Sequence, residues 1–184
     1  EQENNLRTAP TPLAGPTTVR LMQPEDRERW DAFVTACPEA TFFHRSGWKT
    51  AIEQAFGHKT WFLLAEQDGA IQGVLPLAQI KSRLFGHSLA SLPFCVYGGI
   101  AAETRQAREL LDKEAQRIAS ELGVGHLEYR NLHPLHHPDW VHKELYVTFR
   151  KEILEEEEKN MLAIPKKQRA MVRKGIKAGL PGEI

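Results

Sequence analysis

Residues 61–77 read WFLLAEQDGAIQGVLPL and give the clearest structural signal in the sequence. Two β-prone runs flank Asp68-Gly69, a dipeptide that favours the tight turn of a β-hairpin. The sequence therefore predicts two antiparallel strands, Trp61–Glu66 and Ile71–Leu77. Pro76 lacks a backbone N–H, so we expect it to lie at a sheet edge or at a bulge.

Three segments around this hairpin have the apolar spacing of amphipathic helices. The first begins at Pro24 and is stopped by Pro38, and the second has Ser46 as its N-cap. The third has Thr104 as its N-cap and ends at Gly123, which provides a left-handed stop. Each of these helices is expected to bury one face.

Four further segments are predicted to be strands because they are β-rich or alternate between apolar and polar residues. They are Thr17–Met22, Leu92–Ile100, Gly125–Arg130 and Leu145–Ile153. The predicted order is strand, two helices, hairpin, strand, helix, strand, long loop, strand. This order indicates an α+β domain built around one mixed sheet.

The composition limits the class of protein. Lys and Arg together number 24, as do Asp and Glu, so the net charge of the 184 residues is zero. This balance excludes nucleic-acid binding through bulk positive charge. No stretch contains the roughly 18–20 continuous apolar residues of a membrane span. We expect a soluble, cytoplasmic protein in which Cys37 and Cys95 are reduced and Cys95 serves packing.

The charge changes sign abruptly towards the C-terminus. Residues 151–163 hold a run of acids, whereas residues 165–178 hold six cations and no acid. A helix after Pro165 aligns four of these cations in one stripe. They are Lys166, Arg169, Arg173 and Lys177. The stripe is either a solvated surface, partly paired with the acids, or a site for a phosphate-rich ligand such as a nucleotide headgroup or RNA backbone.

Arg130 is a further candidate because it ends a strand and begins a long loop, where charged residues often line a ligand cleft. Pairing with Glu128 or Glu144 explains it equally well. The histidines of residues 131–142 lack the spacing of zinc motifs, which favours an ordinary polar loop over a metal site. His44 is interpreted as a satisfied buried histidine rather than an acid or base.

Four segments in this order resemble the FemAB-like proteins, relatives of the Fem aminoacyltransferases that build peptidoglycan bridges. They are HRSGW at 44–48, the hairpin at 65–77, SLPFCVYGG at 91–99 and PKKQRAMVRKGIKAGL at 165–180. The resemblance is strongest to the branch associated with exosortase and PEP-CTERM systems in exopolysaccharide-making bacteria. It covers the chain from about Val19 to the end.

The resemblance implies a GNAT-like domain over residues 19–164, with a mixed, mostly antiparallel sheet flanked by helices. Residues 1–18, rich in proline, are predicted to be an extended arm. Residues 165–184 would be a basic helix leading towards a missing second GNAT-like domain. The implied function is transfer of an acyl or aminoacyl group to an amine of a peptidoglycan or exopolysaccharide precursor. Charged tRNA or a nucleotide-linked precursor would be the phosphate-bearing partner.

Two alternatives stay open. One is a non-catalytic binding or assembly module for exopolysaccharide export, and the other is a stand-alone acetyl-CoA-dependent N-acetyltransferase. The ligand-facing candidates are Arg130, Tyr97, Lys166, Arg169, Arg173 and Lys177, and the sequence identifies no general base.

The acetyl-CoA motif departs from the GNAT pattern. GNAT enzymes hold the pyrophosphate with Arg/Gln-x-x-Gly-x-Gly/Ala between a strand and a helix N-terminus. The matching place holds Gly98 and Gly99, the cofactor candidates, in a different register, and Glu103 would repel a pyrophosphate. The sequence therefore favours a bulge or tight turn as the reason for these glycines over acetyl-CoA binding.

Overall fold

The computed structural model describes residues 15–82, 86–133, 137, 139–143 and 147–180. The chain divides into two compact units, Glu1–His136 and His137–Ile184. They are called here the amino-terminal and carboxyl-terminal units. Most of the predicted arm at residues 1–18 lies outside the described residues.

The amino-terminal unit is built on a six-stranded sheet. Its strands are β1 (Thr18–Leu21), β2 (Thr60–Gln67), β3 (Ala70–Ser82), β4 (Gly86–Ser91), β5 (Ala101–Ala102) and β6 (His126–Glu128). Their order is β1-β2-β3-β4-β6, with β5 paired to β3. Within the described strands, β4 and β6 run parallel and the other pairs are antiparallel. The predicted α+β class, with a mixed and mostly antiparallel sheet, is confirmed.

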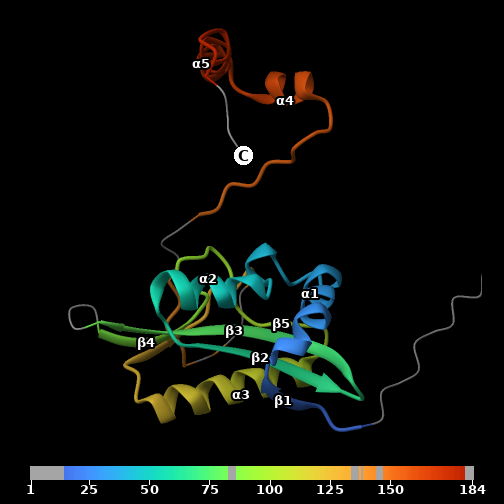
Figure 1. The fold of residues 1–184 in the computed structure, drawn as a ribbon, viewed down its shortest axis with the longest axis vertical. Coiled ribbons are helices and arrows are strands. Elements are labelled where there is room, and N and C mark those ends of the chain that lie inside the picture. Colours follow the sequence, from blue (N-terminus) through green and yellow to red (C-terminus); the bar gives the residue numbers. More distant parts are fainter. Residues whose placement is uncertain (1–14, 83–85, 134–136, 138, 144–146, 181–184) are drawn as a thin grey trace, which may run out of the picture. The chain divides into compact units, whose positions relative to one another are not determined.

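Helices cover both faces of this sheet (Figure 1). Helices α1 (Arg27–Ala36) and α2 (Gly47–Phe56) lie on one face, and α3 (Arg105–Leu122) lies on the other. Strand β2 supplies both cores by alternation, because Phe62 packs on the α1–α2 side and Leu63 on the α3 side. Every second residue of the strands therefore belongs to the same face.

The predicted hairpin is confirmed as β2 and β3. Asp68 and Gly69 both have positive φ, 47° and 78°, as a two-residue turn between twisted strands requires. Beyond the turn, the β2–β3 register shifts by one residue between Ala65 and Glu66. This β-bulge determines which side chains share a face along the rest of the hairpin.

Pro76 lies at a local edge of the central strand β3. Its carbonyl accepts a hydrogen bond from Leu92 N, so its ring nitrogen faces the same side of the strand. On that side β4 pairs with β3 only from Leu77 onward, and β5 pairs only with Gly73 and Val74. The missing N–H therefore falls in the gap between two partner strands, as the edge prediction requires.

The three predicted helices are also confirmed. Thr104 caps α3 because its Oγ1 accepts from Ala107 N at 3.2 Å, and Gly123 follows α3 with φ of 59°. Ser46 occupies the N-cap position of α2, but its hydroxyl makes no capping bond. Instead, Asp31 of α1 accepts from Ser46 Oγ and from Ser46 N, at 3.0 and 2.8 Å. This contact ties α1 to the start of α2.

Two strand predictions are wrong. Residues 92–99 form turns in which Leu92 and Phe94 have φ of 43° and 72°. The apolar run there reflects burial of Leu92 and Cys95 in the α1–α2 core, which needs no strand. The second error concerns Leu145–Ile153: its residues 147–153 are exposed and form no strand, and 145 and 146 lie outside the described residues.

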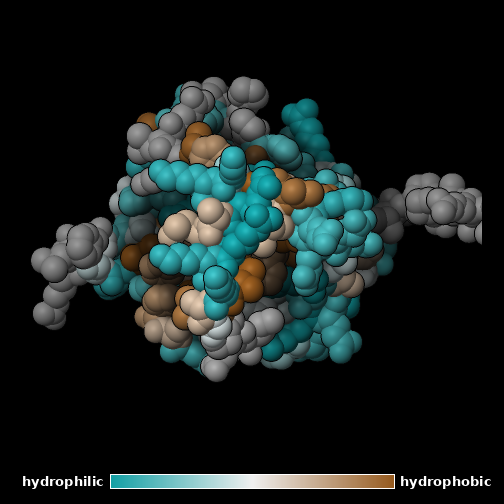
Figure 2. All heavy atoms as spheres, turned by 90° about the horizontal axis from the view of Figure 1, so that it is seen from above, coloured by the Kyte–Doolittle hydropathy of each residue, from teal (hydrophilic) through white to brown (hydrophobic). Residues whose placement is uncertain are grey.

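The described residues of the carboxyl-terminal unit form two helices, α4 (Glu157–Ala163) and α5 (Lys166–Lys177). The predicted basic helix is confirmed, with Pro165 at its N-cap position. None of the residues described between 137 and 180 is buried. Across the face shown in Figure 2, hydrophobic side chains lie at the surface among hydrophilic ones. No helix in the described ranges combines the length and the apolar character needed to cross a membrane.

Candidate functional site

Four predicted site residues meet where β4 and β6 end. Gly98 N and Gly99 N both donate to the carbonyl oxygen of Arg130, at 3.0 and 3.1 Å, and Tyr97 precedes them in the same turn. Since β4 and β6 are parallel, their carboxyl ends lie together at one edge of the sheet. We call this region, residues 91–99 and 128–131, the β4–β6 end.

Arg130 holds the β4–β6 end together. Its Nε donates to Glu128 Oε1 at 2.8 Å, and its Nη1 donates to the carbonyl oxygen of Cys95 at 2.7 Å. Its backbone N donates to Ser91 Oγ at 2.7 Å. The predicted pairing with Glu128 is therefore present, whereas Glu144 lies outside the described residues. A third of the Arg130 side chain, 33%, stays exposed and can meet a ligand.

The two glycines are fixed by close packing. A Cβ on Gly99 would lie 1.9 Å from Asn131 Oδ1, and one on Gly98 would lie 2.6 Å from Leu92 Cβ. Both glycine amides already donate to Arg130, so neither is turned towards a pyrophosphate. The structure accounts for both glycines by packing, and their role towards a cofactor stays a prediction.

Asn131 contributes a group that sequence analysis missed. Its Oδ1 is the one buried side-chain nitrogen or oxygen atom without a hydrogen-bond partner in the part of the chain that the structure describes. Leaving such an acceptor unpaired costs about 1–3 kcal/mol. Buried unpaired acceptors are unusual, and this one lies beside Gly99 within the β4–β6 end.

His44 is a neutral side chain that bonds to the backbone of the β4–β6 end. Its Nδ1 accepts from Thr41 N at 3.0 Å, so the ring proton is on Nε2, which donates to Gly99 O at 2.8 Å. Burial lowers the pKa of the His44 imidazole. Both ring nitrogens are satisfied, which confirms the interpretation of His44 as a buried structural histidine.

Cys95 and Tyr97 lie on the turn that Arg130 holds. Burial raises the pKa of the Cys95 thiol, with nearby Arg130 opposing the shift. A buried thiol with a raised pKa is poorly nucleophilic, in line with the packing role predicted for Cys95. Tyr97 is half-buried. Its role towards a ligand stays a prediction.

The predicted basic stripe lies on α5 in the carboxyl-terminal unit. Lys166, Arg173 and Lys177 are exposed. Arg169 is half-buried, because its Nη2 donates to the carbonyl oxygens of Leu162 and Ile164 at 3.1 and 3.0 Å. Within the described residues, none of the four cations forms an ion pair with an acid. Three cations are therefore available to an anion, and Arg169 mainly joins α4 to α5.

The loop histidines provide no observed metal centre. Among the described residues, no three His, Cys, Asp or Glu side chains are grouped as a metal ion would require. His136 lies outside the described residues. The His137 ring stacks on Trp140, with ring centroids 4.3 Å apart.

No family model matches the chain, and no curated protein matches its sequence. Two of the solved structures to which it is similar in fold are acetyltransferases. A GNAT family acetyltransferase from Staphylococcus aureus subsp. aureus USA300_TCH1516 has a TM-score of 0.48 and 12% identity, over 74% of this chain and 98% of that one. A ribosomal-protein-alanine N-acetyltransferase from Brucella melitensis biovar Abortus 2308 has a TM-score of 0.43 and 14% identity, over 72% and 99%. Both likenesses concern the fold at low sequence identity.

Proposed function

We propose that the chain is the GNAT-like acyltransferase half of a FemAB-like protein, which transfers an acyl or aminoacyl group to an amine of a cell-envelope precursor. The observation that carries this proposal is the β4–β6 end. There a partly exposed guanidinium, Arg130, lies beside a buried acceptor with no partner, Asn131 Oδ1. The four segments that resemble FemAB-like proteins support the choice of family.

Acyl transfer to an amine places few covalent demands on a protein. The amine nitrogen attacks the acyl carbon, the bond to the donor's leaving group breaks, and the amine loses a proton. Positioning of the two reactants supplies much of the rate. The exposed part of Arg130 is suited to bind an anionic group of the donor or the acceptor.

The stripe on α5 adds a site for phosphates. Lys166, Arg173 and Lys177 present exposed cations along one side of the helix. A charged tRNA or a nucleotide-linked precursor carries phosphates that such a stripe binds in a salt-dependent way. This role favours an aminoacyl group delivered by tRNA over an acetyl group delivered by CoA.

The test is an acyl-transfer assay on the full chain, with aminoacyl-tRNA and acetyl-CoA as alternative donors and a nucleotide-linked muropeptide as the amine. We expect transfer from aminoacyl-tRNA, and at least a tenfold loss of rate in Arg130→Gln. The matched control is Arg117→Gln, because Arg117 is an exposed arginine of α3 paired with Glu114 and Glu121. It should keep the wild-type rate.

Arg130 also holds the 92–99 turn, so each variant's thermal unfolding is measured beside its activity. Arg130→Lys keeps the charge but loses the two-pronged contact with Glu128 and Cys95 O. A wild-type chain that transfers from neither donor contradicts the proposal. So does an Arg130→Gln variant that is folded and fully active.

One observation favours a second candidate, the non-catalytic binding module. The amides of Gly98 and Gly99 are occupied by Arg130 O, and the Thr104 hydroxyl occupies the Ala107 amide in the first turn of α3. Three amides that could stabilise an oxyanion or hold a pyrophosphate are thus already used. Binding of the precursor without any transfer would support this module.

A further inference from the structure

A polar pocket lies on the α3 face of the sheet, at the opposite end of β4 from the β4–β6 end. It is a pocket of about 380 Å³ lined by Gly57, His58, Lys59, Gln79, Lys81 and Leu122. Helix α3 ends at Leu122, so the helix no longer covers the sheet beyond that residue. The pocket therefore follows from the length of α3.

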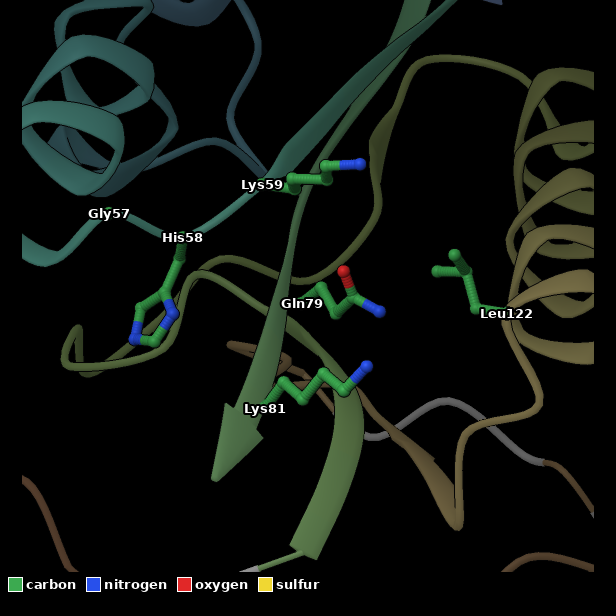
Figure 3. A pocket seen from close by; sticks show the side chains of 6 residues that line it. All are labelled: Gly57, His58, Lys59, Gln79, Lys81 and Leu122. Carbon is green, nitrogen blue, oxygen red and sulfur yellow. The ribbon is translucent and has the colours of Figure 1, made fainter. Parts of the chain in front are cut away.

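The register of the hairpin brings three side chains of this pocket onto one face. Gln79 N donates to Lys59 O at 2.9 Å, which places Gln79 of β3 opposite Lys59, the residue before β2. Lys81 follows Gln79 by two residues and so points to the same side. Figure 3 shows all three side chains directed to the side on which Leu122 lies, whereas the His58 ring points away.

A fourth side chain orients the amide of this group. His87 lies opposite Lys81 in the β3–β4 register. The side-chain nitrogen of Gln79 lies 2.6 Å from Nε2 of His87, and an amide nitrogen can only donate, so His87 Nε2 accepts. This contact fixes the Gln79 amide and leaves its second N–H free to donate to a ligand.

The lining of the pocket is rich in donors and contains no acid. Lys59 and Lys81 have no carboxylate partner within the described residues, although neighbouring cations do, such as Lys49 with Glu53. Two like charges on one face repel each other unless an anion lies between them. A dianion neutralises both ammonium groups, whereas a monocarboxylate neutralises one.

We propose that Lys59, Gln79 and Lys81 bind a small phosphorylated ligand through a phosphate or diphosphate group. The pocket's volume lies within the range of small-molecule sites. Two ammonium groups and an amide N–H match the oxygens of a phosphate, and His87 keeps the amide in place. This binding does not depend on acyl transfer, so it stands or falls separately from the proposed function.

The test is a titration of the full chain with inorganic pyrophosphate. Calorimetry measures the affinity, and the shifts of the backbone amide NMR signals locate the site. We expect saturable binding, with the largest shifts at Lys59, Gln79 and Lys81. The double variant Lys59→Gln/Lys81→Gln should weaken binding at least tenfold. Inorganic phosphate should bind more weakly than pyrophosphate, since it offers fewer oxygens to the two ammonium groups.

The matched control is Lys113→Gln/Lys143→Gln, which removes the same charge from two exposed lysines elsewhere. It should bind pyrophosphate like the wild type. If it loses as much affinity as the pocket variant, bulk charge explains the binding and the proposal is wrong. Absence of pyrophosphate binding to the wild type also overturns it, and leaves the lysines as complements to the C-terminal dipole of α3.

Discussion

Helices α3 and α5 have comparable amphipathic sequences but different surroundings. Helix α3 lies against the sheet and buries Ala107, Leu111, Ala115 and Ile118. Helix α5 buries no residue, and its Met171 and Ile176 are 65% and 66% exposed. An apolar stripe therefore indicates which face of a helix can be buried, and a partner surface decides whether it is.

The two units also differ in how their charged side chains are paired. In the amino-terminal unit, Arg20 and Arg29 both bond to Asp26 and Glu66 in one network that joins β1, α1 and β2. In the carboxyl-terminal unit, most cations of the α5 stripe are exposed. Paired charges stabilise a fold, whereas unpaired exposed ones are available to a ligand.

The largest expected effect on stability comes from shortening a buried side chain of α3, and shortening an exposed side chain of α5 is the comparison. Leu111→Ala in α3 removes a fully buried side chain, so the free energy of unfolding should fall by about 2–5 kcal/mol. Ile176→Ala in α5 should change it by less than about 0.5 kcal/mol. Urea denaturation of both variants measures the difference. Equal losses would show that α5 is packed as tightly as α3.

Acid should weaken the amino-terminal unit through Asp26. The hydrogen bond from Arg20 lowers the pKa of this carboxyl from 3.8 to about 2, and the bond from Gln23 N adds to the shift. Because the folded-state pKa lies below the unfolded value, the stabilisation is present above about pH 4 and is lost as the pH falls towards 2. The loss should be about 2 kcal/mol. Urea denaturation between pH 2 and 5 measures it.

Asp26→Asn is the variant that tests this assignment. It should be less stable at neutral pH and should lose most of the pH dependence between 4 and 2. Glu156→Gln is the matched control in the carboxyl-terminal unit, because the Glu156 side chain is 65% exposed and pairs with Lys159. Exposed pairs contribute little, so its profile should follow the wild type. An unchanged slope in Asp26→Asn would remove Asp26 as the cause.

Local signals were sufficient for the hairpin and the three helices of the amino-terminal unit. A dipeptide such as Asp68-Gly69 constrains the backbone by itself, and so does the cap at Thr104. The segment Leu92–Ile100 failed because an apolar run has the same composition whether it forms a strand or a buried turn. Leu92 and Phe94 have positive φ, and Leu92 and Cys95 are buried in the α1–α2 core.

The β4–β6 end and the pocket depend on how the strands pair, and the sequence does not determine that register. Arg130 was found from its place at a strand end, but its bonds to Cys95 O and to the glycines join distant segments. The pocket depends on the bulge at Ala65 and Glu66. Without that one-residue shift, Lys59 would lie opposite Ala78, which faces the other core. Lys59 and Lys81 would then point to opposite faces of the sheet.

The smallest expected effect is a difference in RNA binding between variants of two cations in the α5 stripe. Arg173 is exposed, whereas Arg169 donates to the carbonyl oxygens of Leu162 and Ile164. The probe is a labelled single-stranded RNA, whose affinity is measured over a range of salt concentrations. Each phosphate contact contributes about 0.7 to the slope of log affinity against log salt. Arg173→Gln should therefore lower the slope by about that amount.

Arg169→Gln should change the salt slope less, because its guanidinium is already bonded to the end of α4. It should instead lower the helical signal of the carboxyl-terminal unit in circular dichroism, which Arg173→Gln leaves unchanged. Equal slopes for the two variants would mean that RNA displaces the carbonyl oxygens from Arg169. The stripe would then bind through all four of its cations, and the separation between a structural and a ligand-facing arginine would be lost.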